Sequence, residues 1–216
     1  MKERGMIFNG EMVLAILGGR KTQTRRPIKW KQTRFTEIGE REDGSRWPWS
    51  EDAEHVCDFW HPCPFGAVGD RIWVRETWNK YGGLLTYRAD HDWIDDMRKE
   101  TVCTAKWVPS IHMPRWASRI LLEITDVRVE RVNAISPEDA ESEGLERTNF
   151  TGFGDEPGLP SYPEPDVYFD PLKKQWKEYP PEAFAGLWES IYGEGSWQAN
   201  PWVWVIEFKR VEGGAA

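Results

Sequence analysis

The sequence predicts a small α+β domain in which mixed and antiparallel strands close into a sheet and a few short helices cover it. Two observations support this class. Short segments with alternating apolar residues recur between turns that contain Gly or Pro, and segments with helical spacing are few and brief. The 216 residues are enough for one well-buried core, so we expect a single domain over residues 1–212 and a tail at 213–216.

The first expected elements are a short strand and a helix. Residues 6–8 are a short apolar segment typical of a strand, and residues 11–17 carry apolar side chains at helical spacing. Gly18 and Gly19 end this helix, because two glycines in succession favour a chain reversal. Residues 30–62 show weak periodicity and mixed charge, so we expect an irregular insertion there.

The clearest strands lie in the middle of the chain. Residues 71–76 follow a Gly-Asp turn and alternate in polarity, and residues 84–89 and 120–132 form two further strands. In the last of these, the apolar residues change face near Thr125 and Asp126. This change predicts a bulge or bend, which a small closed sheet needs.

The next helix has signals at both of its ends. Ser136 is a typical N-cap, Pro137 suits the first helical position, and Asp139 lies three residues after the cap. Gly144 then ends the segment. We therefore expect a compact helix between Ser136 and Gly144.

The C-terminal third predicts a loop, a helix and a strand. Residues 149–171 contain five prolines and three glycines, which indicates an extended or mobile loop within an insertion over 149–178. Apolar residues at helical spacing over 184–191 predict an amphipathic helix that Gly193 closes. Residues 202–210 are apolar on both faces, which is typical of a strand at the centre of a sheet.

Composition limits the function classes. The chain carries 28 Lys and Arg against 36 Asp and Glu, for a net charge of −8, and no apolar run approaches the roughly 20 residues of a membrane span. Its three cysteines cannot all pair, and the N-terminus does not resemble a secretory signal. We expect a soluble, cytoplasmic protein with no membrane partner; the sequence does not indicate its oligomeric state.

The most unusual charge feature is a basic stretch. Seven basic residues and no acidic one lie between Gly18 and Thr36. On an acidic protein, such a stretch indicates a docking point for a phosphate-bearing ligand. Arg20 also complements the dipole at the end of the preceding helix, but this does not account for Arg25 and Arg26, which lie beyond its last turn.

Aromatic residues are a second unusual feature. Many of the 14 tryptophans stand beside Pro, Arg or Lys rather than in periodic apolar runs. Such residues either stack on bases or pack within irregular loops. His112, Arg115 and Trp116 form one such group, and we consider them candidate contacts to a phosphate or base, with a loop histidine bonded to backbone as the alternative.

Four potential metal ligands lie within nine residues: His55, Cys57, His61 and Cys63. Histidine nitrogen and cysteine sulfur suit zinc. The spacing nevertheless matches no standard zinc module, and Cys103 is isolated. We therefore expect no metal and no cofactor.

Four motifs together resemble the ASCH domain family. They are a helix ending in Gly-Arg-Lys-Thr-x-Thr-x-Arg, a Gly-Asp turn before a Trp-Val strand, a short helix ending in Glu-Gly, and a terminal Val-Ile-Glu-Phe strand. The resemblance implies a small β-barrel similar to the PUA fold. It covers residues 5–30, 62–90, 116–146 and 182–210, and the Pro- and Trp-rich segment 109–116 is similar to those of longer members from bacteriophages and prophages.

The resemblance also implies catalytic residues. Family members that remove the acetyl group from N(4)-acetylcytidine use a Lys, a Thr three residues later and a Glu on the short helix, which correspond to Lys21, Thr24 and Glu143. A threonine hydroxyl needs a base to become nucleophilic, and burial or nearby cations can lower the pKa of a lysine enough for that role. The alternative is that Lys21 and Thr24 belong to a solvated turn and Glu143 is surface charge.

These observations predict a protein that binds a modified nucleoside, a nucleotide or single-stranded RNA, and that hydrolyses an acyl amide on a base such as N(4)-acetylcytidine. A non-catalytic RNA-binding or regulatory module and a ribonuclease are the alternatives. The net charge argues against broad binding to long duplexes. The residues expected to contact the ligand are Arg20, Arg25, Arg26, Glu76, His112, Arg115 and Trp116.

Overall fold

The protein has a mixed α+β fold built around one five-stranded sheet. The structure is a computed structural model that describes residues 1–29, 37–52, 57–81, 83–91, 106–148 and 166–211. The strands of the central sheet lie in the order β1 (Glu3–Ile7), β6 (Arg71–Arg75), β9 (Leu121–Arg131), β13 (Trp202–Arg210) and β2 (Gln23–Pro27). β1 and β6 are parallel, and the other neighbouring pairs are antiparallel. The predicted α+β class is confirmed.

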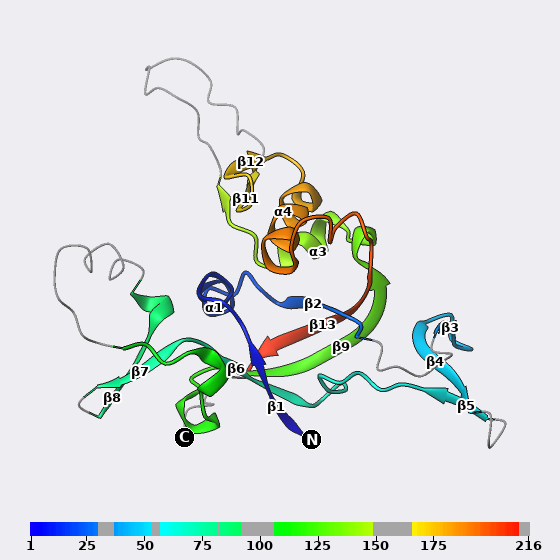
Figure 1. Ribbon diagram of the computed structural model, residues 1–216, viewed down its shortest axis with the longest axis horizontal. Coiled ribbons are helices and arrows are strands. Elements are labelled where there is room, and N and C mark those ends of the chain that lie inside the picture. The colour runs from blue at the N-terminus through cyan, green and yellow to red at the C-terminus, as the bar shows by residue number, and fades with distance from the viewer. Residues whose placement is uncertain (30–36, 53–56, 82, 92–105, 149–165, 212–216) are drawn as a thin grey trace, which may run out of the picture.

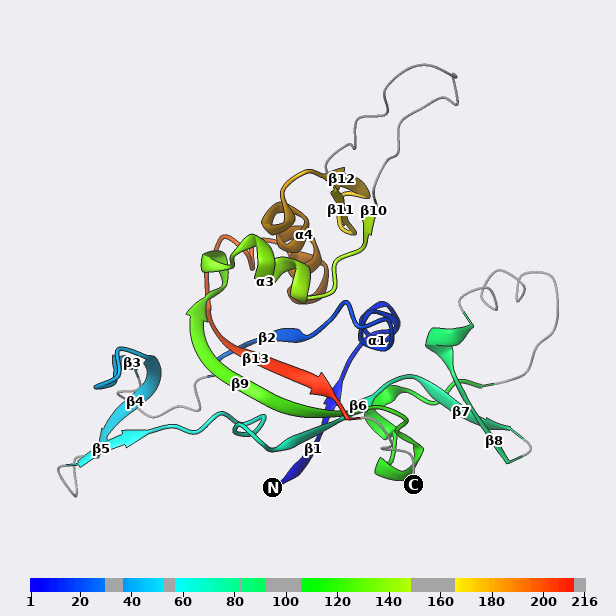
Figure 2. The same ribbon diagram turned by 180° about the vertical axis from the view of Figure 1, so that it is seen from behind.

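The sheet is strongly curved but open. Figures 1 and 2 show β9 and β13 bending together beneath the helices. In their ladder, Glu207 pairs with Asp126 and Phe208 pairs with Ile124, so Thr125 is the extra residue of a β-bulge. The bulge predicted at this position is confirmed. A closed barrel is not confirmed, because β1 and β2 are the two edges of the hydrogen-bonded order.

Both faces of β13 are covered. Trp204, Ile206 and Phe208 belong to an apolar cluster that includes residues of β1, β6, β9 and helix α1 (Gly10–Leu17). Val203 and Val205 belong to a second cluster with helices α3 (Pro137–Ser142) and α4 (Pro180–Tyr192). The prediction of a central strand over 202–210 is therefore confirmed.

The three α-helices in the described part of the chain begin or end at recognisable residues. The side chain of Asn9 accepts from the backbone N–H of Met12 at 2.8 Å and caps α1. Ser136 accepts from the N–H of Asp139 at 3.1 Å and caps α3. Gly193, with φ of 94°, ends α4. All three helices lie where the sequence predicts them.

The insertion predicted over residues 30–62 is not irregular in its described part. It contains a three-stranded sheet of β3 (Glu37–Glu40), β4 (Arg46–Asp52) and β5 (Cys57–Trp60). The ring of Trp47 meets Trp204 edge-on at 4.9 Å and joins this small sheet to the central one. The prediction was wrong because weak periodicity and mixed charge do not exclude strands that pair with one another, and β4 forms even with Pro48 inside it.

The second insertion also contains strands. β11 (Val167–Asp170) pairs with β10 (Arg147–Thr148) and β12 (Gln175–Lys177). The loop predicted up to residue 171 is therefore wrong at its end, while its residues 149–165 lie outside the described part of the chain, as does the tail at 213–216.

Over the residues that the structure describes, the remaining elements are a hairpin and four short 3₁₀ helices. Figures 1 and 2 show the hairpin at the end of the molecule opposite β3, β4 and β5. In chain order these elements are β7 (Trp78–Tyr81), β8 (Leu84–Tyr87), η1 (Arg88–Asp90), η2 (Ser110–His112), η3 (Arg115–Ala117) and η4 (Val132–Ala134). Among the described helices, none combines the length and apolar character needed to cross a bilayer.

Candidate functional site

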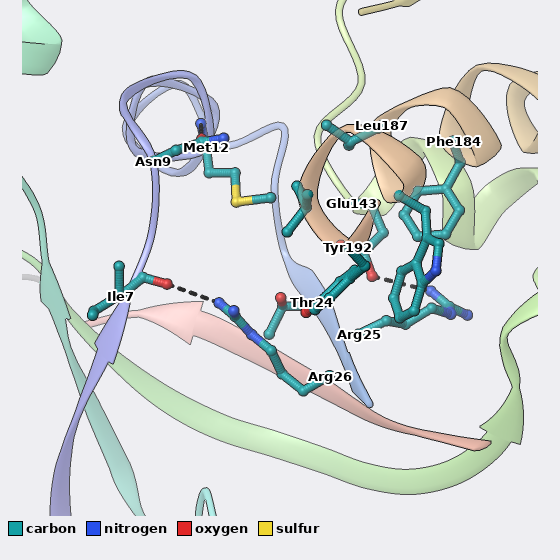
Figure 3. Close-up of a pocket in the computed structure, with 12 residues that line it drawn as sticks. Ile7, Asn9, Met12, Thr24, Arg25, Arg26, Glu143, Phe184, Leu187 and Tyr192 are labelled. Atoms are coloured by element: carbon teal, nitrogen blue, oxygen red, sulfur yellow. Dashed lines mark hydrogen bonds and ion pairs between the residues drawn. The ribbon is translucent and has the colours of Figure 1, made fainter. Parts of the chain in front are cut away.

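A small pocket lies between α1, α4 and strand β2. Figure 3 shows side chains of β1, α1, β2, α4 and the end of α3 pointing toward it. Its volume is about 180 Å³. The lining residues are Ile7, Asn9, Met12, Thr24, Arg25, Arg26, Glu143, Phe184, Leu187, Trp188, Ile191 and Tyr192.

Lys21 forms a buried pair with Glu143, which lines this pocket, whereas Lys21 itself is not one of the lining residues. Lys21 precedes β2 and makes an isolated antiparallel bridge with Glu143, the residue that caps the C-terminus of α3. Its ammonium donates to Glu143 Oε2 at 2.7 Å and to the Glu143 carbonyl oxygen at 2.8 Å. The two side chains are 0% and 3% exposed, so neither is the solvated surface charge that was the alternative interpretation.

Gly144 allows the close approach that makes this pair. Its φ is 86°, a conformation that favours glycine. A Cβ at this position would lie 2.7 Å from Lys21 Cβ and 2.9 Å from Ala15 Cβ. The glycine that ends α3 therefore also lets the main chain of Lys21 pack against the helix terminus.

The surroundings of Lys21 lower its pKa from the usual value. Burial is the main cause, because it disfavours the charged ammonium. Glu143 opposes this by attraction and hydrogen bonding, whereas the positive charges of Arg26 and Arg25 add to the decrease. A lysine in this setting is easier to deprotonate than a surface lysine, as a general base requires.

Thr24 lies on β2 and lines the pocket, as Figure 3 shows. The residue is 2% exposed. Within the described residues, its hydroxyl is not hydrogen bonded to Lys21 or to Glu143. Of the three predicted catalytic residues, Thr24 and Glu143 therefore line one pocket, and Lys21 is connected to it through its contact with Glu143.

Arg25 lines the same pocket, but its guanidinium is enclosed by acceptors. It donates to Glu143 Oε1 at 3.3 Å, to Asp139 Oδ2 at 2.8 Å and to Glu130 Oε2 at 3.3 Å. It also donates to the side-chain oxygen of Gln23. A group with these partners is poorly placed to bind a phosphate, which was its expected role.

The other two arginines of the basic stretch differ in position. Arg26 lines the pocket and donates to the carbonyl oxygen of Ile7 at 2.9 Å (Figure 3). Its guanidinium also lies over the ring of Phe8 at 5.3 Å. Arg20 donates to the carbonyl oxygen of Leu145 at 3.1 Å and lies outside this pocket. Only Arg26 of these two is placed to contact a bound ligand.

The apolar wall of the pocket comes from α4, and sequence analysis missed it as part of a site. Trp188 and Tyr192 lie one turn apart, with ring centroids separated by 4.3 Å. Burial raises the pKa of the Tyr192 hydroxyl. The helical spacing of apolar residues predicted a helix face that packs into the core. A helix face that lines a cavity has the same spacing, so the sequence does not distinguish the two.

Glu76 lies in a separate polar cluster. Its carboxylate accepts from Arg119 Nε at 2.9 Å and from Arg119 Nη2 at 3.0 Å. Arg119 also donates to both oxygens of Asp90. Burial raises the pKa of Glu76, and the hydrogen bonds from Arg119 oppose this increase. Glu76 does not line the pocket of Lys21 and Glu143.

His112, Arg115 and Trp116 do not line the pocket either. Arg115 Nε donates to Glu3 at 2.9 Å, and Glu3 begins β1, whereas Ile7 at the other end of β1 lines the pocket. These two ends lie about 13 Å apart at the usual rise of a strand. His112 is exposed, and Trp116 is 59% exposed. None of the three contributes to this pocket.

The four potential zinc ligands are only partly described. His55 and the side chain of Cys57 lie outside the described residues. His61 bonds through Nε2 to the hydroxyl of Ser50 at 2.9 Å, and burial raises the pKa of the Cys63 thiol to about 11. Within the part of the chain that the structure describes, no three His, Cys, Asp or Glu side chains are grouped as metal ligands.

Comparisons of the chain with protein-family models, with curated proteins and with solved structures give no match. The relationship to ASCH proteins therefore stays a prediction from the motifs of the sequence. What the molecule does has to be inferred from the pocket itself.

Proposed function

We propose that this protein is an ASCH-type, PUA-like amidohydrolase that removes an acyl group from the exocyclic amine of a modified nucleoside such as N(4)-acetylcytidine. The observation that carries the proposal is the buried Lys21–Glu143 pair, whose Glu143 lines a small pocket together with Thr24. The lowered pKa of Lys21 supplies a base, and Thr24 supplies a nucleophile. The cytoplasm is the proposed location.

The proposed reaction has two steps. Neutral Lys21 takes the proton of the Thr24 hydroxyl while the oxygen attacks the acyl carbonyl carbon. The carbon–nitrogen bond breaks, the amine leaves with that proton, and the acyl group stays on Thr24 as an ester. Water then attacks the ester with Lys21 again as the base, which releases the acid and restores the hydroxyl. One water and N(4)-acetylcytidine thus give cytidine and acetic acid.

The remaining lining residues have roles in this scheme. Glu143 holds the Lys21 ammonium through two of its oxygens, so the lysine stays near the pocket edge. The rings of Trp188 and Tyr192 offer an apolar surface of the kind on which bases stack. The direct contact between Lys21 and Thr24 is expected to form when substrate binds, because such hydrogen bonds often tighten only in the complex.

Two alternatives from the sequence have less support. Both RNA binding without catalysis and ribonuclease activity use free cations to bind phosphates. Arg25, however, is surrounded by the carboxylates of Glu143, Asp139 and Glu130. An RNA-binding function would appear as salt-sensitive affinity that falls on substitution of Arg25 and Arg26, and a nuclease would shorten the RNA.

The decisive experiment is incubation of the purified protein with N(4)-acetylcytidine, with cytidine and acetate followed by chromatography. We expect both products in equal amounts, and we expect Lys21→Ala to lower kcat/KM by about 100-fold or more. Arg20→Ala is the matched control, because it removes a neighbouring cation that lies outside the pocket. Full turnover in Lys21→Ala would contradict the role of the lysine, and absence of product from the wild type would exclude this substrate.

A further inference from the structure

A cluster of polar side chains lies behind Glu143 and has no part in the proposed reaction. It joins β2, β9, β13 and α3, and we call it the Arg25 cluster. Arg25 is its centre, with a side chain that is 0% exposed. The other members are Gln23, Arg128, Glu130, Asp139 and Glu207.

The cluster contacts the candidate catalytic pair through a single carboxylate. The two oxygens of Glu143 have separate partners: Oε1 accepts from Arg25 Nη1 at 3.3 Å, and Oε2 accepts from Lys21 Nζ at 2.7 Å. Figure 3 shows the Arg25 contact from the pocket side. Arg25 therefore acts on Lys21 through Glu143.

Arg25 is itself held firmly. Asp139 Oδ2 accepts from Arg25 at 2.8 Å and from Arg128 Nη2 at 2.8 Å, and Asp139 Oδ1 accepts from the amide of Gln23 at 3.0 Å. The ring of Phe184 covers the guanidinium at 5.9 Å. A planar guanidinium with these fixed partners presents one N–H group to Glu143 in a defined direction.

We propose that Arg25 is a positioning residue, which keeps Glu143 turned toward Lys21 so that the lysine can release and regain its proton in a fixed geometry. The catalytic consequence of this role of Arg25 rests on the proposed function. The effect of Arg25 on the protonation of the Lys21–Glu143 pair is independent of the proposed function, because it follows from the buried charges alone.

The charge balance gives the direction of the effect. Glu143 of α3, Arg25 and Arg26 of β2, and Tyr192 of α4 are the titratable and charged groups that bear on Lys21 and its partner. When the Lys21–Glu143 pair loses its proton, it changes from neutral to a net charge of −1. Arg25 remains positive and stabilises that form, so removing its charge makes the pair harder to deprotonate.

The test is a carbon-13 NMR titration of Lys21 Cε in lysine-labelled protein without substrate, with the signal assigned by its loss in Lys21→Arg. Arg25→Gln removes the charge but keeps hydrogen-bonding groups. We expect it to raise the titration midpoint by about one pH unit or more. Arg128→Gln is the matched control, because Arg128 contacts Asp139 and Glu130 but not Glu143. The titration midpoint of Lys21 in this variant should equal that in the wild type.

Arg25→Lys keeps the charge, but its one ammonium cannot take over all the contacts of the guanidinium to Glu143, Asp139 and Glu130. Its midpoint should rise by less than that of Arg25→Gln, and this variant carries the test if Arg25→Gln does not fold. An unchanged midpoint in both Arg25 variants overturns the proposal. An equal rise in Arg128→Gln overturns it as well, since the effect would then be a general loosening of the cluster.

The readout separates this proposal from the proposed function. If the midpoint shifts but N(4)-acetylcytidine is not hydrolysed, the positioning role stands and the substrate assignment fails. If hydrolysis occurs but the midpoint does not shift, the substrate assignment stands and the positioning role of Arg25 fails. Where both succeed, the rise of kcat/KM with pH should move in Arg25→Gln by the same amount as the NMR midpoint.

Discussion

Lys21 Nζ donates to two oxygens of the same residue, Glu143, at 2.7 Å for the side chain and 2.8 Å for the carbonyl, although 122 positions separate the two residues in the chain. One contact depends on the rotamer of Glu143, and the other depends only on the backbone at the end of α3. The position of the ammonium is therefore linked to the helix terminus itself, so a change in that terminus should alter the chemistry of the lysine.

The first prediction concerns pH. A base must be neutral to accept a proton, and burial lowers the pKa of Lys21. We therefore expect kcat/KM to rise with pH, with a midpoint below the usual lysine pKa of 10.5, and then to reach a plateau. Rates of cytidine release measured from neutral to alkaline pH test this. Lys21→Arg should be inactive throughout, because arginine stays protonated. A rate that falls over the same range contradicts the base role.

The second prediction concerns the glycine that ends α3. Gly144→Ala should lower the free energy of unfolding by about 2–4 kcal/mol, from a strained backbone and an overpacked contact with Lys21 and Ala15. Gly19→Ala is the matched control, because its φ is also positive, at 74°, but no atom lies within 4 Å of the new Cβ. It should lose only about 1–2 kcal/mol in the same urea titration. Equal losses would show that close packing at Gly144 is unimportant.

The third prediction concerns acid stability. Burial raises the pKa of Asp139, but the hydrogen bonds from Gln23 and Arg25 outweigh this and hold it below the usual 3.8. A carboxyl with a lowered pKa stabilises the fold above its unfolded pKa, and that contribution is lost as pH falls through the folded pKa. The free energy of unfolding should therefore decrease below about pH 4.

Asp139→Asn tests this assignment, because it should flatten the acid decrease and lower stability at neutral pH. Asp43→Asn is the control, since the Asp43 pKa is lowered by hydrogen bonds from Ser45 in an exposed turn outside the cluster. Urea titrations at several pH values measure both variants. An acid decrease that is the same in Asp139→Asn and in the wild type would exclude Asp139 as its source.

Local signals explain why much of the fold could be predicted. Ser136 and Gly144 mark the two ends of α3, and the change of face near Thr125 marks the bulge of β9. Each signal depends on residues within one or two turns of chain, so it can be recognised without the tertiary structure. The strand over 202–210 is equally clear, because both of its faces are apolar.

The missed elements depend on contacts between distant segments. β2 contains Gln23, Thr24, Arg25 and Arg26, with no apolar alternation, and it is a strand because it pairs with β13. Its polar side chains are acceptable in the interior because acceptors from β9, β13 and α3 meet them there. Neither those partners nor the register that brings them together is visible in the sequence of β2.

The candidate site, like the fold, could be predicted only in part from the sequence. The motif indicated Lys21, Thr24 and Glu143, of which Thr24 and Glu143 line one pocket and Lys21 is paired with Glu143. The basic character of the stretch was misleading, because the sequence does not show that Arg25 is neutralised by three carboxylates from elsewhere. His112 and Trp116 were included for their chemistry, and only the tertiary structure shows that neither lines the pocket.

The last prediction concerns the aromatic wall. Stacking of a base on an aromatic side chain contributes about 1–3 kcal/mol, so Tyr192→Ala should weaken binding of N(4)-acetylcytidine by roughly 5- to 150-fold. Calorimetry on the Lys21→Ala background measures this affinity without turnover. Tyr179→Ala is the matched control, because Tyr179 is exposed at the opposite end of α4 and outside the pocket. Should Tyr192→Ala bind as tightly as Tyr179→Ala, the base does not stack on Tyr192.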